Sequence, residues 1–287
     1  MDDSDLAFLQ GFLARTSGMA LWSEKRYLAD ARLEPLAKRL GLEGLPALIA
    51  KLKRRNDPAL DQMVMAAMTT NDTSFFRDRK PFEQFETVML PALIARRAAT
   101  RRLRIWCSAV SSGQEAYSLA MMLADHAQDL EGWRIDLVGT DLSKDVLATA
   151  AQGRYTHFEV QRGVPVRLLL QHFRPEGTEW QISDAIRRAV DFRILNLNDE
   201  YPAVGPFDVI FCRNVLLYFE QSRRGDALDR VVTQLADDGF LVLGATESLI
   251  GLTAKVASDP DNRGIYMRPQ FLRSARSQQP PSALAPR

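Results

Sequence analysis

The 287-residue chain has little of the features that mark several specialised protein classes. It holds two cysteines, too few for a disulfide scaffold and wrongly spaced for a zinc site. No apolar run reaches the roughly 18 residues that cross a bilayer, and the acidic residues 1–5 are unlike a signal peptide. Its 37 Lys and Arg are balanced by 36 Asp and Glu, which excludes a uniformly basic nucleic-acid-binding protein. We expect a cytoplasmic protein that is not membrane-embedded and binds no nucleic acid.

The composition that is present is that of a globular protein, with 46% hydrophobic and 25% charged residues. Within residues 1–70, apolar side chains recur at helical spacing in three stretches, at 8–13, 33–40 and 45–52. Asn56-Asp57-Pro58 then interrupts the pattern. Because no strand pattern occurs there, residues 1–70 predict a small helical domain.

After residue 100, β-rich runs alternate with helical stretches. Three short apolar runs predict strands, at 103–107, 133–140 and 207–212. Two amphipathic stretches predict helices, at 115–127 and 222–236. Asp238-Gly239 predicts a turn into a further strand. Strands alternating with helices predict a parallel sheet with helices on both faces.

Residues 153–195 do not follow this alternation, because glycines and prolines separate short apolar runs there. We interpret 153–195 as a small subdomain inserted into a larger domain that spans 81–270. Residues 71–80 would link the helical domain to it. The tail at 274–287 contains Gln-Gln-Pro-Pro and predicts disorder.

The first candidate site segment is CSAVSSGQE at 107–115, which follows the first predicted strand. Ligands of doubly wound sheets bind at this position. Gly113 permits close backbone approach, and Glu115 favours a cationic ligand group such as an α-amino group. The loop is not G-x-G-x-x-G, which argues against an NAD enzyme. The alternative is a plain strand–helix turn in which Glu115 complements the helix dipole.

Three further segments carry polar side chains at predicted element ends. Asp141 follows the second strand, where an acid can accept from ribose hydroxyls; it could instead cap the next helix. Asn214 and Tyr218 would share one face if a helix starts there, or Tyr218 could be a core aromatic. Arg77 lies in the linker segment TTNDTSFFRD at 69–78, which could otherwise be a hydrophobic plug with a surface ion pair.

Five segments in the same order resemble the chemotaxis protein-glutamate O-methyltransferases, the CheR family. They are TTNDTSFFRD at 69–78, WCSAVSSGQEAYSLAM at 106–121, GTDLS at 139–143, FDVIFCRNVLLYF at 207–219 and GATES at 244–248. The resemblance runs from about residue 5 to 270. It implies an α/β fold: a Rossmann-like S-adenosylmethionine-dependent methyltransferase domain with an inserted small antiparallel β-subdomain, preceded by a small all-α N-terminal domain.

The resemblance also implies an activity. The chain would transfer a methyl group from S-adenosylmethionine to glutamate side chains of chemoreceptors, giving glutamate methyl esters and S-adenosylhomocysteine. Its partner would be the cytoplasmic domain of a methyl-accepting chemoreceptor. Basic residues of the helical domain would dock it: Lys51, Lys53, Arg54 and Arg55, with Lys25, Arg26, Lys38 and Arg39 nearby in the sequence. We expect a monomer without a metal site. The alternatives are a non-catalytic S-adenosylmethionine-binding sensor or scaffold, and a methyltransferase with a different acceptor.

By the same resemblance, residues from several segments would form the site. Asn71, Thr73 and Arg77 would reach the cofactor from the linker, and Gly113 and Glu115 would lie at its amino-acid moiety. The remaining cofactor contacts would be Asp141 at the ribose, Asn196 and Leu197 near the adenine, and Arg213 and Asn214 along the pocket. Arg77 and Tyr218 would lie nearest the transferred methyl and act as the catalytic residues. The chain departs from the common pattern at Cys107 and Val110, where many relatives have Ser and Cys.

Overall fold

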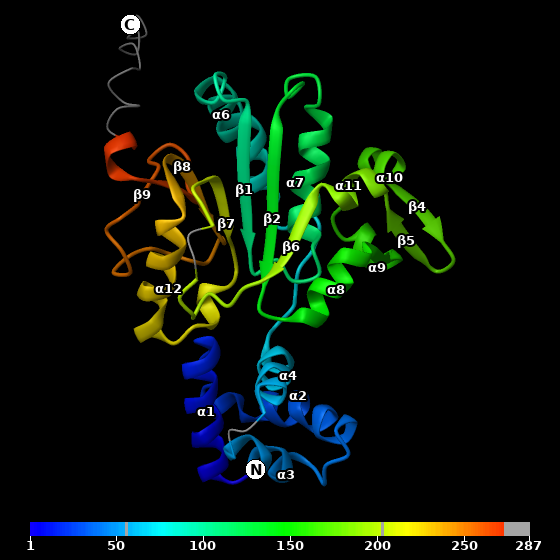
Figure 1. The fold of residues 1–287 in the computed structure, drawn as a ribbon, viewed down its shortest axis with the longest axis vertical. Helices are drawn as coiled ribbons and strands as arrows, with labels where there is room; N and C mark the ends of the chain where they lie inside the picture. Colours follow the sequence, from blue (N-terminus) through cyan, green and yellow to red (C-terminus); the bar gives the residue numbers. More distant parts are fainter. Residues whose placement is uncertain (55–56, 202–203, 273–287) are drawn as a thin grey trace, which may run out of the picture.

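The computed structural model describes residues 1–54, 57–201 and 204–272, and the tail predicted to be disordered lies outside them. The N-terminal residues form a helical layer below the rest of the molecule (Figure 1). Its helices are α1 (Asp3–Ser17), α2 (Arg26–Arg39), α3 (Leu45–Lys53) and α4 (Pro58–Met68), with a 3₁₀ turn at Ser23–Lys25. The predicted all-α N-terminal domain is thereby confirmed.

Local sequence explains where these helices begin and which side they bury. α4 begins with Pro58 in its first turn, and the Asp57 carboxylate accepts from the backbone N–H of Leu60 at 3.0 Å. The apolar residues at helical spacing meet in one core, in which Leu9, Leu33 and Leu48 are fully buried. Each helix therefore owes its stability to an apolar stripe that needs the others to be covered.

The larger domain is built on a seven-stranded sheet in the order β6-β2-β1-β7-β8-β10-β9. The strands are β1 (Arg102–Ser108), β2 (Arg134–Asp141), β6 (Val190–Ile194), β7 (Phe207–Cys212), β8 (Leu235–Leu243), β9 (Ala257–Ser258) and β10 (Ile265–Met267). The first five strands in this order pair in parallel, and β10 and β9 add antiparallel. All parallel strands therefore end at the same edge.

Helices cover both faces of the sheet, as predicted. The helices are α5 (Lys80–Gln84), a π-helical turn at Phe85–Met89, α6 (Leu90–Arg96), α7 (Gln114–Asp125), α8 (Lys144–Gln152), α11 (Asp184–Arg188) and α12 (Gln221–Thr233). Ile105 and Cys107 face the core under α6 and α7, whereas Trp106 and Cys212 face the core under α12. The two thiols therefore lie on opposite faces of the sheet. The helical segment 80–96 was not among the predicted elements.

A second, three-stranded antiparallel sheet forms the inserted β-subdomain, at the right of Figure 1. Its order is β3-β5-β4, with strands β3 (Arg154–Thr156), β4 (Phe173–Glu176) and β5 (Glu179–Ile182) and helices α9 (His157–Gln161) and α10 (Val166–His172). The insertion is shorter than the predicted 153–195, because β6 pairs with β2 in the main sheet. This five-residue edge strand gave no separate signal in the sequence.

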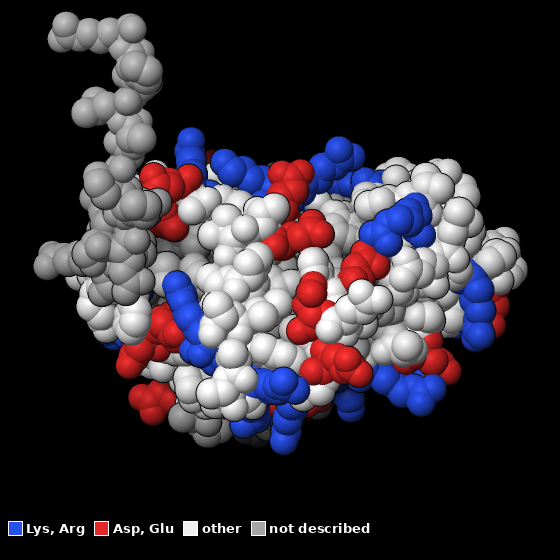
Figure 2. Space-filling view, turned by 90° about the horizontal axis from the view of Figure 1, so that it is seen from above, with Lys and Arg blue, Asp and Glu red and all other residues white. Residues whose placement is uncertain are grey.

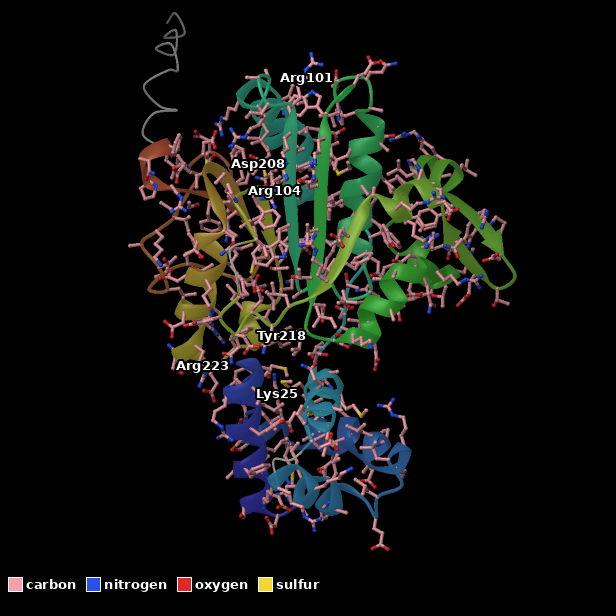
Figure 3. All side chains as sticks on the ribbon, viewed as in Figure 1. Lys25, Arg101, Arg104, Asp208, Tyr218 and Arg223 are labelled. Atoms are coloured by element: carbon pink, nitrogen blue, oxygen red, sulfur yellow. The ribbon has the colours of Figure 1, made fainter. Side chains whose placement is uncertain are left out.

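The prediction of a turn at Asp238-Gly239 is wrong. Both residues lie inside β8, where the pairing shifts from Phe207 with Leu235 to Val209 with Phe240, so the extra residues form a bulge. Arg97 connects the two strands at the bulge: its Nε donates to Asp208 at 2.7 Å and its Nη1 donates to Asp238 at 2.8 Å. Asp208 lies near the end of the sheet that is remote from Tyr218 and Lys25 (Figure 3).

The end of the molecule remote from the helical domain has a mixed charge. Seen from that side, acidic and basic side chains are interspersed rather than gathered into one patch (Figure 2). No helix within the described residues is long and apolar enough to cross a membrane.

Candidate active site between the sheet edge and the helical domain

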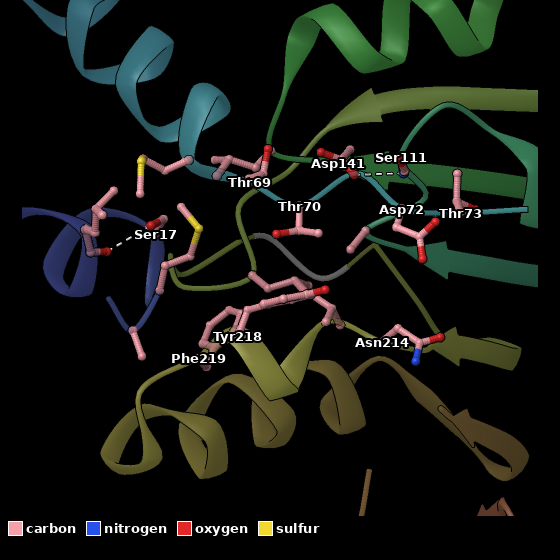
Figure 4. Close-up of a pocket in the computed structure, with 18 of the residues that line it drawn as sticks. Ser17, Thr69, Thr70, Asp72, Thr73, Ser111, Asp141, Asn214, Tyr218 and Phe219 are labelled. Atoms are coloured by element: carbon pink, nitrogen blue, oxygen red, sulfur yellow. Dashed lines mark hydrogen bonds between the residues drawn. The ribbon is translucent and has the colours of Figure 1, made fainter. Parts of the chain in front are cut away.

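A pocket lies where the parallel strands end and the helical domain begins (Figure 4). Its sheet side comes from the loops after β1, β2, β6 and β7 and from the linker, and includes Thr73, Arg77, Glu115, Asp141, Asn196, Leu197, Arg213, Asn214 and Tyr218. Its other side comes from α1, the α1–α2 connection, α2 and the end of α4. The pocket thus brings together most of the predicted site residues, although they are scattered over the sequence.

The most buried charges of the pocket are centred on Arg213, whose side chain is 1% exposed. Its guanidinium donates from Nη1 to Glu115 Oε2 and from Nη2 to Asp78 Oδ2, both at 2.7 Å. Burial raises the pKa of Glu115, and the neighbouring Arg213 opposes this shift. One cation between two carboxylates leaves an excess negative charge, which suits a ligand ammonium group.

Asp141 ties together the two loops that follow β1 and β2. Its Oδ2 accepts from the Ser111 N–H and its Oδ1 from the Ser143 N–H, each at 2.9 Å (Figure 4 shows the first bond). Burial raises the pKa of this carboxyl group, and the backbone bonds oppose that shift. The cap of α8 is the Ser143 hydroxyl. With Leu142 as a third backbone donor, the carboxylate still keeps an acceptor position for a ligand hydroxyl.

The linker contains both a hydrophobic plug and a pocket-lining arginine, the two interpretations that the sequence left open. Phe75 is buried as a plug, edge-on to the rings of Tyr155 and Phe173 in the inserted subdomain. Arg77 instead lines the pocket, and its Nη1 donates to the Asp72 carbonyl at 2.6 Å while its Nη2 lies 3.5 Å from Asp72 Oδ2. The phenylalanine therefore anchors a segment that presents the arginine.

The segment after β7 differs from its prediction. No α-helix starts at Arg213: Asn214 has a left-handed backbone, with φ of 57°, and a short 3₁₀ helix follows at Leu216–Tyr218. Asn214 and Tyr218 nonetheless both line the pocket (Figure 4). They are brought together by a turn and not by helical spacing.

Two predicted residues do not line the pocket, and a third has its side-chain amide occupied. Asn71 is exposed, and its carbonyl accepts from the Ser111 hydroxyl at 3.1 Å. Gly113 has φ of 95°, and a Cβ there would lie 3.0 Å from the Cβ of Ala150, so its role is close packing. Asn196 lines the pocket, but its Nδ2 donates to the Thr16 carbonyl at 2.6 Å and so caps the end of α1.

The contribution of the helical domain to the pocket was not predicted from the sequence. Residues of the α1–α2 connection line it, Met19 and Trp22 among them, together with Lys25, Arg32 and Met68. The connection also pairs with the segment that bears Tyr218, since the Ala20 N–H donates to the Tyr218 carbonyl at 2.8 Å. Only Trp22, a partly exposed aromatic between two helices, could have signalled this.

The pocket as a whole fits a nucleoside that carries an amino-acid group. Its charged end holds Glu115, which Arg213 links to Asp78 outside the lining, Asp141 lies at the strand ends, and Leu142, Leu197 and Met19 supply apolar walls. No cluster of His, Cys, Asp and Glu that could hold a metal ion occurs among the described residues.

Comparisons with known proteins agree with this geometry. The family model "CheR methyltransferase, SAM binding domain" matches residues 71–263. Chemotaxis protein methyltransferase 1 of Pseudomonas aeruginosa is 39% identical over 254 residues, which cover 87% of this chain and 92% of that protein. Chemotaxis protein methyltransferase Cher2 of Pseudomonas putida is 38% identical, with 84% and 89% covered. A chemotaxis protein methyltransferase of Vibrio parahaemolyticus is 35% identical, with 93% and 98% covered.

Proposed function

Because the chain belongs to the CheR family of S-adenosylmethionine-dependent methyltransferases, we propose that its methyl acceptors are glutamate side chains of chemoreceptors. The products would be glutamate methyl esters and S-adenosylhomocysteine. The observation that carries the proposal is the pairing, in one pocket, of a negatively charged cluster for an ammonium group with Arg77 and Tyr218, which suit an acceptor carboxylate.

In the proposed complex, this chain's residues hold S-adenosylmethionine in three places. Glu115, with Asp78 beside it, meets the α-ammonium group, and Asp141 accepts from the ribose hydroxyls. Leu197 packs near the adenine, and Asn196 supports that wall while its amide caps α1. Thr73, Arg213 and Asn214 also line the pocket. Asn71 and Gly113 do not line it and support the adjoining loops by a backbone hydrogen bond and by close packing.

The acceptor needs no general base. A glutamate with a pKa near about 4.3 is already ionised at neutral pH, and S-adenosylmethionine supplies an electrophilic methyl group. The protein therefore has to align and desolvate the carboxylate. Arg77 and Tyr218 orient it, and Asp72 already shares the Arg77 guanidinium. Because Asp72 shares this guanidinium, Arg77 binds the acceptor carboxylate less tightly in the ground state. Tight ground-state binding would oppose the reaction.

The helical domain would dock the acidic acceptor region. Lys51 pairs with Asp57 at 3.6 Å and Lys53 with Asp5 at 2.7 Å, so these two predicted docking residues are partly neutralised. Arg55, a third, lies outside the described residues. Lys38, Arg39 and Arg54, like Lys25, form no ion pair within the described chain, so their positive charges are available to an acidic partner.

A methyl-transfer assay tests the proposal. The protein is incubated with methyl-tritiated S-adenosylmethionine and a receptor cytoplasmic fragment, and the product is treated with base. We expect volatile tritiated methanol that depends on the receptor fragment, since carboxyl methyl esters are base-labile. Base-stable label would indicate a different acceptor atom. Cofactor binding by calorimetry without any transfer would indicate a sensor or scaffold and contradict the proposal.

A further inference from the structure

The loop that carries Arg213, Asn214 and Tyr218 is held by one carboxylate that is not among the described residues lining the pocket. Glu247, in the segment after β8, accepts four backbone N–H groups. Its Oε2 accepts from Asn214 at 2.7 Å and from Gly244 at 2.9 Å. Its Oε1 accepts from Val215 at 3.0 Å and from Leu217 at 3.3 Å. Four donors for one carboxylate occupy all of its usual acceptor positions.

These bonds stabilise a backbone that is otherwise unfavourable. Asn214 adopts a left-handed conformation, with φ of 57°, and the 3₁₀ helix after it is a single turn. The N–H groups of such a turn have no helical partners of their own, and a charged acceptor forms stronger hydrogen bonds with them than a neutral one does. Glu247 thereby fixes the loop from the side away from the pocket.

The surroundings of Glu247 are shaped for this contact. Gly244 lies so close that a Cβ there would be 2.8 Å from Glu247 Oε2 and 2.8 Å from Asn214 Nδ2. On the carbonyl side of the same loop, Arg224 donates to Leu217 at 3.3 Å and to Phe219 at 3.0 Å. Glu247 therefore binds the N–H groups of the loop, and Arg224 binds its carbonyl groups.

We propose that Glu247 is a positioning residue for methyl transfer, acting through the loop and not through contact with either reactant. Holding Asn214 and Leu217 sets where Tyr218 presents its hydroxyl, whereas Arg213 is fixed separately by Glu115 and Asp78. Loss of the carboxylate should therefore misplace the acceptor end of the site more than the cofactor end. The inference rests on the proposed function for the identity of the acceptor.

The test is Glu247→Gln, which keeps the shape but turns an amide donor toward backbone donors. We expect kcat to fall about 100-fold, the scale of a 1 Å misplacement, while the dissociation constant of S-adenosylmethionine changes less than about threefold. Glu247→Asp keeps the four acceptor lone pairs and should recover part of kcat. Gly244→Ala, whose Cβ would push Glu247 Oε2 and Asn214 apart while keeping the carboxylate's chemistry, should give the same pattern as Glu247→Gln and serves if that variant does not fold.

Ser248→Ala is the matched control, because the Ser248 hydroxyl accepts only from Ile250 in the exposed part of the same segment. It should keep wild-type kcat. A folded Glu247→Gln enzyme with wild-type kcat and only a lower melting temperature would overturn the proposal. So would an equal loss of cofactor binding and turnover, which indicates general collapse of the site. Wild-type protein without receptor-dependent turnover would instead contradict the proposed function.

Discussion

At the scale of single residues, the two arginines of the pocket differ in how many carboxylates they pair with. Arg213 meets two carboxylates, so the cofactor end of the pocket is negative before any ligand binds. Arg77 meets one partly exposed carboxylate, Asp72, and so keeps positive character toward the pocket. In the proposed complex, Glu115 therefore meets the ammonium group of the cofactor and Arg77 the acceptor carboxylate.

Glu115 should control cofactor affinity in a pH-dependent way. Burial raises its pKa above the ordinary value of 4.5, so it gains a proton at a higher pH than an exposed glutamate as the pH falls. The protonated form cannot pair with an ammonium group, and cofactor affinity should therefore weaken as the pH falls through that raised pKa. At neutral pH, Glu115→Gln should weaken binding about 10- to 100-fold, and the acid-dependent change due to this group should disappear. Calorimetric titration between pH 5 and 8 would measure both; equal affinity in the variant would contradict this role.

Arg77 should separate turnover from cofactor binding. Its guanidinium lines the acceptor end of the pocket, so Arg77→Ala removes alignment of the carboxylate and leaves the Arg213 cluster in place. We expect kcat to fall about 100-fold with a small change in cofactor affinity. Steady-state kinetics with the receptor fragment, beside calorimetry, measures the two effects. Equal turnover in the variant would exclude a role for Arg77 in transfer.

At the scale of elements, the contact between α1 and the sheet domain joins cofactor site and helical domain. The last carbonyls of α1 accept from Asn196 and Asn198, at 2.6 and 2.8 Å. Directly after them, Gly18 ends the helix with φ of 74° and lies against the Phe219 ring. The end of α1 is thus capped by the other domain, and two of these residues, Asn196 and Phe219, also line the pocket.

Gly18→Ala should loosen this contact. A Cβ at Gly18 would lie 2.5 Å from the Phe219 ring, whereas Gly41, also with positive φ, has open space around its Cβ position. Both substitutions carry the cost of a left-handed alanine, of order 1 kcal/mol, but only Gly18→Ala adds a steric clash. We expect Gly18→Ala to lower the melting temperature more than Gly41→Ala and to weaken cofactor binding. Thermal unfolding and calorimetry of the pair measure this; identical behaviour would show that the contact is not required.

At the scale of the whole molecule, the proposed active site lies at the junction of the helical domain and the sheet. α2 ends in Lys38 and Arg39, for which no ion pair occurs in the described part of the chain. The remote end of the sheet domain has mixed charge instead (Figure 2). An acidic acceptor region should therefore approach from the helical side, and salt should weaken this approach.

Reversal of this charge should affect the acceptor and not the cofactor. Lys38→Glu with Arg39→Glu should raise the KM for the receptor fragment about tenfold, roughly 1.4 kcal/mol, and reduce its dependence on salt. Arg134→Glu is the control, since Arg134 is 72% exposed and begins β2 at the opposite end of the sheet. Initial-rate kinetics at 50 and 300 mM salt give both quantities. An unchanged KM would exclude docking through these two residues.

The sequence by itself determined the helical N-terminal domain, the alternation of strands and helices after it and the polar residues that end the strands. It did not determine the helical segment 80–96 or the edge strand β6. Apolar periodicity reports which side of a helix or strand is buried, and parallel strands must end at one edge, so Glu115, Asp141 and Asn214 could be assigned to one site. Only the tertiary structure decided the partners. The pairing of β6 with β2, the capping of α1 by Asn196 and the grip of Glu247 on the loop after β7 join residues far apart in the chain. Such contacts depend on how packed elements meet, and a local pattern of residues carries no record of that.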